Sequence, residues 1–245
     1  MFDWLLGSRV PPPAPVPEEW RSFLWEYSSH YRRLPAAAEG PFEDAVQRFI
    51  ATQRITGVHV DVDDRLRLLV AASAVTLALG WPGYKWSELA EVLLYPDSFD
   101  PDYSIGPREL AGVAHVWGTI ILSVPSLWRS FEYYEDQYHV GLHEFAHLLT
   151  FERGTNIRIP VGLRGRRIEL WEKIQARELK RIRNGESVVE MLAEPTEVEF
   201  FPCVVEAFFQ KPIELSEKHR RLYRFLRQYF DQDPAGWEMS KGPSA

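Results

Sequence analysis

Residues 143–147 read His-Glu-Phe-Ala-His, and this stretch constrains the fold of the chain more than any other. Two histidines four positions apart lie on one face of an α-helix, about one turn from each other. Both rings can therefore reach one tetrahedral zinc ion, which binds imidazole nitrogen readily. Glu144 follows the first histidine directly and can approach the open side of the metal without binding it. The spacing is typical of zinc-dependent peptidases, in which Glu144 would be the general base that deprotonates a zinc-activated water.

The residues around this motif are apolar and predict a helix that is buried on most sides. They are Val140, Phe145, Ala146, Leu148 and Leu149. Three polar side chains inside such a helix are costly unless a metal or a hydrogen-bond partner satisfies them. The alternative is two surface histidines beside a solvated glutamate, but the neighbours are too apolar for a solvated face.

Composition limits the classes of protein and partner. The length of 245 residues suits one domain with a sizeable core. A net charge of −7 argues against direct binding of nucleic acid, which needs a basic surface. Cys203 is the only cysteine, which favours a reducing compartment. The most apolar run, residues 66–81, contains Arg67 and is too short to span a membrane, and residues 1–9 make a poor secretory signal. We therefore predict a cytoplasmic protein without a membrane partner.

The chain is predicted to consist of a flexible proline-rich leader over residues 1–17, a single domain over 18–235 and a tail over 236–245. The expected fold class is α+β, mostly helical, with a small β-sheet that precedes the motif helix. Short runs rich in β-branched and apolar residues predict the strands, at residues 92–95 and 118–124.

Helices are predicted where apolar residues recur at helical spacing. The expected ranges are 18–33, 42–53, 66–79, 126–134, a motif helix from about 136, 167–184, a helix within 194–209, and 213–230. The helix over 66–79 is apolar nearly all round and should be the central core helix, capped by Asp61 or Asp63. Residues 35–40 should break the chain between the first two helices, and residues 152–165 should form a loop.

A catalytic zinc site needs a third protein ligand beside the two histidines. The helix within residues 194–209 carries Glu199 and Glu206, which are seven positions apart and hence on one face. We assign Glu199 as the ligand because it opens this apolar helix. Glu206 is better placed to orient a ligand histidine through its free ring nitrogen. The alternative for Glu199 is a charge that the helix dipole favours at this end.

Other polar residues near these positions admit two interpretations each. His139 lies one turn before His143 and is either an extra ligand or a partly buried histidine, and the second interpretation is favoured. Cys203 lies one turn after Glu199 and can face the site, but a small apolar filler is the favoured interpretation. Glu194 and Glu197 precede the helix and are expected to cap it or to face solvent.

The stretch HEFAH, preceded by GTIILSV and followed by EFFPCVVEAFF, resembles the Mlc titration factor A family of bacterial zinc peptidases. The resemblance covers roughly residues 15–235. That family is related to the protease domain of anthrax lethal factor, so the resemblance implies a zincin-like metallopeptidase core. It also implies a cytoplasmic setting, peptidase activity, the zinc ligands His143, His147 and Glu199, and the catalytic base Glu144.

Two positions depart from the family pattern. A family tyrosine, placed to stabilise the oxyanion, is Leu192 here, and a family aspartate after the second histidine is Thr150. The loss of one oxyanion donor typically lowers turnover by about 100- to 1,000-fold, unless another group replaces it. The candidates for that replacement precede the motif helix: Tyr133, Tyr134 and Tyr138.

The chain therefore has two candidate functions. The first is an aminopeptidase or endopeptidase that acts on a peptide or protein substrate. The second is a regulatory zinc-binding protein that sequesters a transcriptional repressor, with weak or no catalysis. The intact Glu144 favours the first function, because a structural zinc site needs no base.

Overall fold

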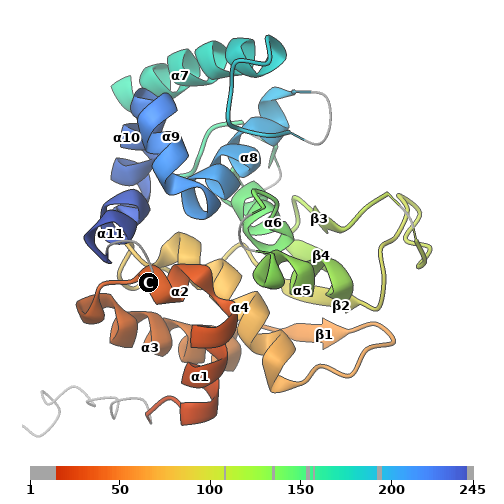
Figure 1. The fold of residues 1–245 in the computed structure, drawn as a ribbon. Helices are drawn as coiled ribbons and strands as arrows, with labels where there is room; N and C mark the ends of the chain where they lie inside the picture. Colours follow the sequence, from red (N-terminus) through yellow and green to blue (C-terminus); the bar gives the residue numbers. More distant parts are fainter. Residues whose placement is uncertain are drawn as a thin grey trace, which may run out of the picture.

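The computed structural model describes residues 15–107, 109–133, 136–152, 155–156, 158–191 and 195–241. Helices predominate, and a four-stranded sheet lies beside them (Figure 1). The α+β class, mostly helical with a small sheet, is confirmed. The first 14 residues of the predicted leader lie outside the described ranges, and the division into leader, domain and tail stays a prediction.

The first four helices differ from the predicted ranges at their ends. They are α1 (Glu18–Tyr27), α2 (Ser29–Arg33), α3 (Ala36–Thr52) and α4 (Asp64–Ala78). The single helix expected over 18–33 is divided at Ser28, whose hydroxyl accepts the Tyr31 N–H at 3.2 Å and caps α2. The interruption expected over residues 35–40 is confined to Leu34 and Pro35, because α3 begins at Ala36. Asp63 caps α4 by accepting the Leu66 N–H at 2.9 Å.

The sheet has the strand order β1-β2-β4-β3. Its strands are β1 (Ile55–Gly57), β2 (Glu91–Tyr95), β3 (Gly112–Ala114) and β4 (Thr119–Ser123). The first three in this order are parallel, whereas β3 pairs with β4 in the antiparallel direction. The predicted strands correspond to β2 and β4, while β1 and β3 were not predicted. Strand β3 forms an edge of the sheet.

The second half of the chain is helical apart from one short hairpin. Its elements are α5 (Val124–Glu132), α6 (Val140–Leu148), β5 (Phe151–Glu152), β6 (Thr155–Asn156), α7 (Arg166–Arg183), α8 (Glu197–Gln210), α9 (Pro212–Lys218), α10 (Arg220–Phe230) and α11 (Pro234–Lys241). The hairpin lies in the expected loop. The helix expected over 213–230 is two helices that meet at His219, and residues 236–241 of the expected tail belong to α11.

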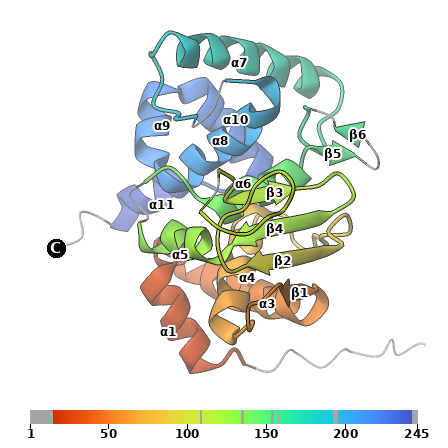
Figure 2. The same ribbon diagram turned by 90° about the vertical axis from the view of Figure 1, so that its right-hand side faces the viewer.

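Helix α6 lies between two groups of elements, with the sheet and α1–α5 on one side and α7–α10 on the other (Figures 1 and 2). It contacts α4, α5, α8, β3 and β4. The crossing with α4 is close at Gly141, where an added Cβ would lie 2.2 Å from the Ser73 Oγ. Within the described part of the chain, no helix has the length and apolarity needed to cross a membrane.

Candidate metal centre

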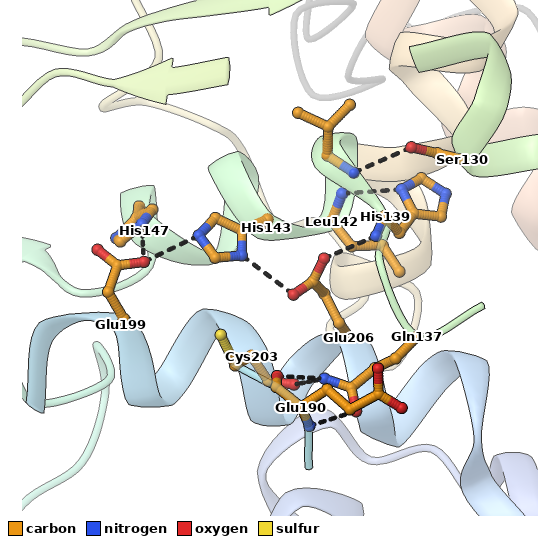
Figure 3. Close-up of polar contacts among 11 residues, drawn as sticks. Ser130, Gln137, His139, Leu142, His143, His147, Glu190, Glu199, Cys203 and Glu206 are labelled. Atoms are coloured by element: carbon orange, nitrogen blue, oxygen red, sulfur yellow. Dashed lines mark hydrogen bonds and ion pairs between the residues drawn. The ribbon is translucent and has the colours of Figure 1, made fainter. Parts of the chain in front are cut away.

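Helix α6 begins at Val140, rather than at about residue 136, because the ring of His139 caps it. The His139 Nδ1 accepts the Leu142 N–H at 3.2 Å (Figure 3). Burial lowers the pKa of His139 to about 3, so the ring stays neutral and keeps the lone pair that a cap needs. His139 is thus a capping residue of the motif helix.

The side chains of His143, His147 and Glu199 converge, although α6 and α8 are far apart in the sequence. The Glu199 Oε2 lies 3.1 Å from the His143 Nε2 and 3.5 Å from the His147 Nε2 (Figure 3). The three ligand atoms lie within 4.8 Å of one another. Glu199 holds this place because it stands in the first turn of α8, where its N–H donates to the Thr196 hydroxyl at 3.3 Å.

Glu206 fixes the orientation of His143 from the next turns of α8. Its two carboxylate oxygens accept the His139 N–H at 2.6 Å and contact the His143 Nδ1 at 3.1 Å. Because an ionised carboxylate only accepts hydrogen bonds, we infer that the His143 Nδ1 carries the proton. When the ring is neutral, the lone pair of its Nε2 faces Glu199, which is the arrangement a metal ligand requires.

The remaining acidic residues and Cys203 have separate places. Cys203 is buried, and its Sγ lies within 4.8 Å of ligand atoms of His143 and Glu206. Glu197 is half-exposed and forms an ion pair with Arg158. Glu194 lies outside the described residues. Among the glutamates of α8, Glu199 is therefore the one that meets both histidines.

Glu144 is buried beside strand β3, where a glycine makes room for it. A Cβ added at Gly112 would lie 2.7 Å from the Glu144 Oε1 and 2.7 Å from the Val140 Cγ2. Any larger residue at this position would displace the carboxyl group. Burial raises the pKa of Glu144, and the charges of His143 and His147 oppose that shift.

The electrostatics of the cluster favour positive charge. Burial lowers the pKa of His143, but the Glu206 carboxylate and contacts with Cys203 and Glu199 outweigh it, so the pKa lies well above its usual value. Hydrogen bonds from His143 and His147 hold the pKa of Glu199 well below its usual range. The raised pKa of His143 follows from the carboxylates beside it, and the lowered pKa of Glu199 follows from the histidine N–H groups that donate to it.

A cavity of about 180 Å³ opens onto these residues. His143, Glu144 and Glu199 line it. Residues 109–112, which lead into β3, also line it, as do Glu190 and Met191. Glu144 thus lines the same cavity as His143 and Glu199, two of the three residues whose ligand atoms converge.

Some backbone groups of β3 point away from β4. The Ser123 N–H donates to the Ala111 carbonyl and the His115 N–H donates to the Thr119 carbonyl, each at 2.8 Å. Bonded and non-bonded pairs alternate in an antiparallel ladder, so Gly112 and Ala114 direct their N–H and C=O groups outward. The described residues place no strand on that side.

Comparison with known proteins identifies the family. The model of the family described as glucose-regulated metallo-peptidase M90 matches residues 6–231. The chain belongs to this family. A protein of Synechocystis sp. described as uncharacterised is 29% identical over 90% of this chain and 86% of its own length.

Two further relatives of this M90 family member carry the name Mlc titration factor A. The protein of Edwardsiella ictaluri is 26% identical over 71% of this chain and 70% of its own length. That of Yersinia enterocolitica is 24% identical over 96% of this chain and 86% of its own length. The resemblance drawn from the sequence motifs is therefore confirmed.

Membership of the metallo-peptidase M90 family implies a metal, and the chemistry of the converging donors fits one. Two imidazoles and one carboxylate are a ligand set of catalytic zinc sites. Here a carboxylate oxygen and the inferred lone pair of the His143 Nε2 lie 3.1 Å apart. Two acceptors at this distance repel each other unless a proton or a cation lies between them.

The structure places some of the residues at which this M90 family member departs from the Mlc titration factor A pattern, and some of the tyrosines that could replace the missing one. Leu192 and Tyr134 lie outside the described residues. Thr150 donates its hydroxyl to the His147 carbonyl at 2.8 Å and so ends α6. Tyr133 is 60% exposed, whereas Tyr138 lines the cavity.

Sequence reasoning missed two residues of the site. Gly112 makes room for Glu144, and Gln137 bonds to the backbone of Glu190. Neither belongs to a motif, because each acts on a residue that is distant in the sequence. A prediction of β3 would have drawn attention to Gly112, as glycine inside a strand often marks a close approach.

Proposed function

We propose that this member of the metallo-peptidase M90 family is a zinc-dependent peptidase with a zincin-like core. The observation that carries the proposal is the cavity that Glu144 shares with His143 and Glu199, whose ligand atoms converge with that of His147, beside the outward edge of β3. A metal site with a purely structural role needs neither an adjacent base nor a binding edge. The substrate is a peptide or protein, cut by an aminopeptidase or endopeptidase reaction.

In this proposal His143, His147 and Glu199 hold the zinc ion. When bound, zinc would act as a Lewis acid, which polarises a carbonyl and lowers the pKa of water. Glu144 takes a proton from the attacking water and passes it to the leaving amine. Glu206 keeps His143 in the tautomer that leaves its Nε2 free.

Strand β3 is proposed to bind the substrate backbone. An extended peptide can add to the free edge and pair with the outward groups of Gly112 and Ala114. Gly112 also packs against Glu144, so this pairing would bring a substrate carbonyl next to the base. Backbone pairing is tolerant of side chains, and the pocket residues would supply the specificity.

A second candidate function rests on the name of the two relatives called Mlc titration factor A. By analogy, this chain would bind a transcriptional regulator, with or without cleaving it, in the cytoplasm. The role of Glu144 distinguishes the two functions. Hydrolysis needs its carboxylate, whereas binding of a regulator does not.

We expect the purified chain to contain about one zinc ion per molecule and to hydrolyse peptides. Chelation should abolish hydrolysis, and added zinc should restore it, because three ligands hold the ion reversibly. Metal analysis paired with a peptide-hydrolysis assay, before and after chelation, checks both statements. Hydrolysis that persists in metal-free protein would contradict a zinc mechanism, and zinc-loaded protein without hydrolysis would favour the regulatory function.

Gly112→Ala should lower kcat for peptide hydrolysis by about 10-fold or more, because the new methyl group displaces Glu144 and a misplaced base loses rate steeply. Zinc content should stay near the wild-type value, since the three ligands are untouched. The matched control is Gly40→Ala, whose added Cβ meets nothing within 4 Å. A Gly112→Ala variant with wild-type kcat would contradict the role given to this glycine.

A further inference from the structure

The Gln137 side chain forms hydrogen bonds with both backbone polar groups of Glu190. Its Nε2 donates to the Glu190 carbonyl at 2.8 Å, and its Oε1 accepts the Glu190 N–H at 2.8 Å (Figure 3). The carboxamide thus pairs with this residue as a neighbouring strand would. The Gln137 side chain is only 3% exposed, so its two bonds form where few water molecules compete.

The segment around Glu190 forms one side of the cavity that holds Glu144. Glu190 and Met191 line that cavity together with residues 109–112 and Gln137 itself. The Glu190 carboxylate points to the exterior, where it pairs with Lys211 at 3.0 Å. The backbone of this segment, rather than the Glu190 charge, is therefore what Gln137 fixes.

A second buried group anchors the same segment closer to α7. The His219 Nε2 accepts the Val188 N–H at 3.2 Å. The His219 Nδ1 lies 2.6 Å from the Glu178 Oε2, and both side chains are buried. Residues 188–190 are thus held at two points, which makes this side of the cavity a preformed wall.

Gln137 also ties that wall to the metal-binding helices. It lies two residues before His139, whose N–H donates to Glu206 and whose ring caps α6. The Gln137 Nε2 approaches the Cys203 carbonyl of α8 at 3.4 Å as well. A displacement of Gln137 would therefore shift the wall relative to His143 and Glu144.

We propose that Gln137 is a positioning residue of the substrate cleft, which holds Glu190 and Met191 as a wall of the cavity that residues 109–112 also line. An extended peptide substrate would then enter a cleft whose two sides are already ordered. This inference rests on the proposed peptidase function. Glutamine suits the role because one side chain offers both the donor and the acceptor that the Glu190 backbone requires.

Gln137→Leu tests this role in the zinc-loaded full chain with an eight-residue peptide substrate. We expect KM to rise by about 10-fold, because the wall must be ordered when substrate binds, while kcat stays within about 3-fold. Zinc content should not change. Hydrogen exchange at the Glu190 amide should accelerate by about 10-fold or more, since this N–H loses its acceptor.

Gln232→Leu is the matched control for a general loss of stability. Gln232 is also 3% exposed and donates to a backbone carbonyl, that of Thr76, at 2.8 Å, but it does not line the cavity. Its replacement should lower Tm without raising KM. Gln137→Glu keeps the acceptor and loses the donor, so its KM should lie between those of wild type and Gln137→Leu.

The outcomes separate this inference from the function on which it rests. If wild type hydrolyses the peptide and Gln137→Leu has the same KM, the positioning role is overturned while the peptidase proposal stands. An equal rise in KM for Gln232→Leu would also overturn it, because the effect would then follow stability alone. Absence of hydrolysis in zinc-loaded wild type would overturn the peptidase proposal, and the substrate role of Gln137 with it.

Discussion

Glu144→Gln should lower peptide hydrolysis by at least about 100-fold while zinc content and Tm stay near their wild-type values. Glutamine has almost the shape of glutamate but cannot accept a proton from water, and general base catalysis typically contributes a factor of about 100 to 10,000. Because Glu144 is buried against Gly112, an isosteric change is the one that leaves the packing intact. Steady-state kinetics together with metal analysis measures both effects.

Glu172→Gln is the matched control for this experiment. Glu172 lies on α7, is exposed to solvent and does not line the cavity, so the change removes one carboxylate without touching the base or the cleft. Hydrolysis should change by less than about 3-fold, because exposed charges interact weakly through water. Activity that survives Glu144→Gln would rule out water activation by this residue.

Glu199→Ala should reduce zinc affinity by about 10-fold or more and abolish most hydrolysis, since one of three protein ligands is lost. The change also removes the acceptor that contacts both histidine rings, at 3.1 and 3.5 Å. Zinc titration measures the affinity directly. The rise in Tm on zinc addition gives a second readout that does not depend on catalysis, because a ligand that binds only the folded state stabilises it.

Glu197→Ala provides the control from the same turn of α8. Glu197 pairs with Arg158 at the surface and does not face the histidines, so zinc affinity should stay at the wild-type level. Glu206→Ala should weaken zinc binding indirectly, through the loss of the His143 contact. If Glu199→Ala retains full zinc affinity while Glu206→Ala loses it, the assignment of the third ligand is wrong.

Periodicity alone predicted the elements in which the decisive interactions are local. The ring nitrogens of His143 and His147 share one helix face because an α-helix repeats every 3.6 residues. Asp63 was recognisable as one of two possible caps, since a cap bonds only to residues of its own helix. Strands β2 and β4 are continuous apolar runs, typical of strands buried between other elements.

The ends and breaks of the helices were less predictable, because buried side chains decide them. The ring of His139 starts α6 later than the apolar pattern suggests. His219 lies between α9 and α10, where its buried ring contacts Glu178. In both cases a single side chain binds a specific polar partner, and average propensities do not contain that partner.

The sequence by itself determined that two histidines and a glutamate would share a buried helix, and it predicted a third ligand, Glu199, on a later helix. Tertiary structure alone brought the Glu199 carboxylate to the histidines, placed the edge of β3 beside Glu144, and joined Gln137 to the backbone of Glu190. The physical reason is the separation in sequence between the residues that interact. Helical spacing is set by neighbours within one turn, whereas the contacts of Glu199 and Gln137 join residues more than 50 positions apart.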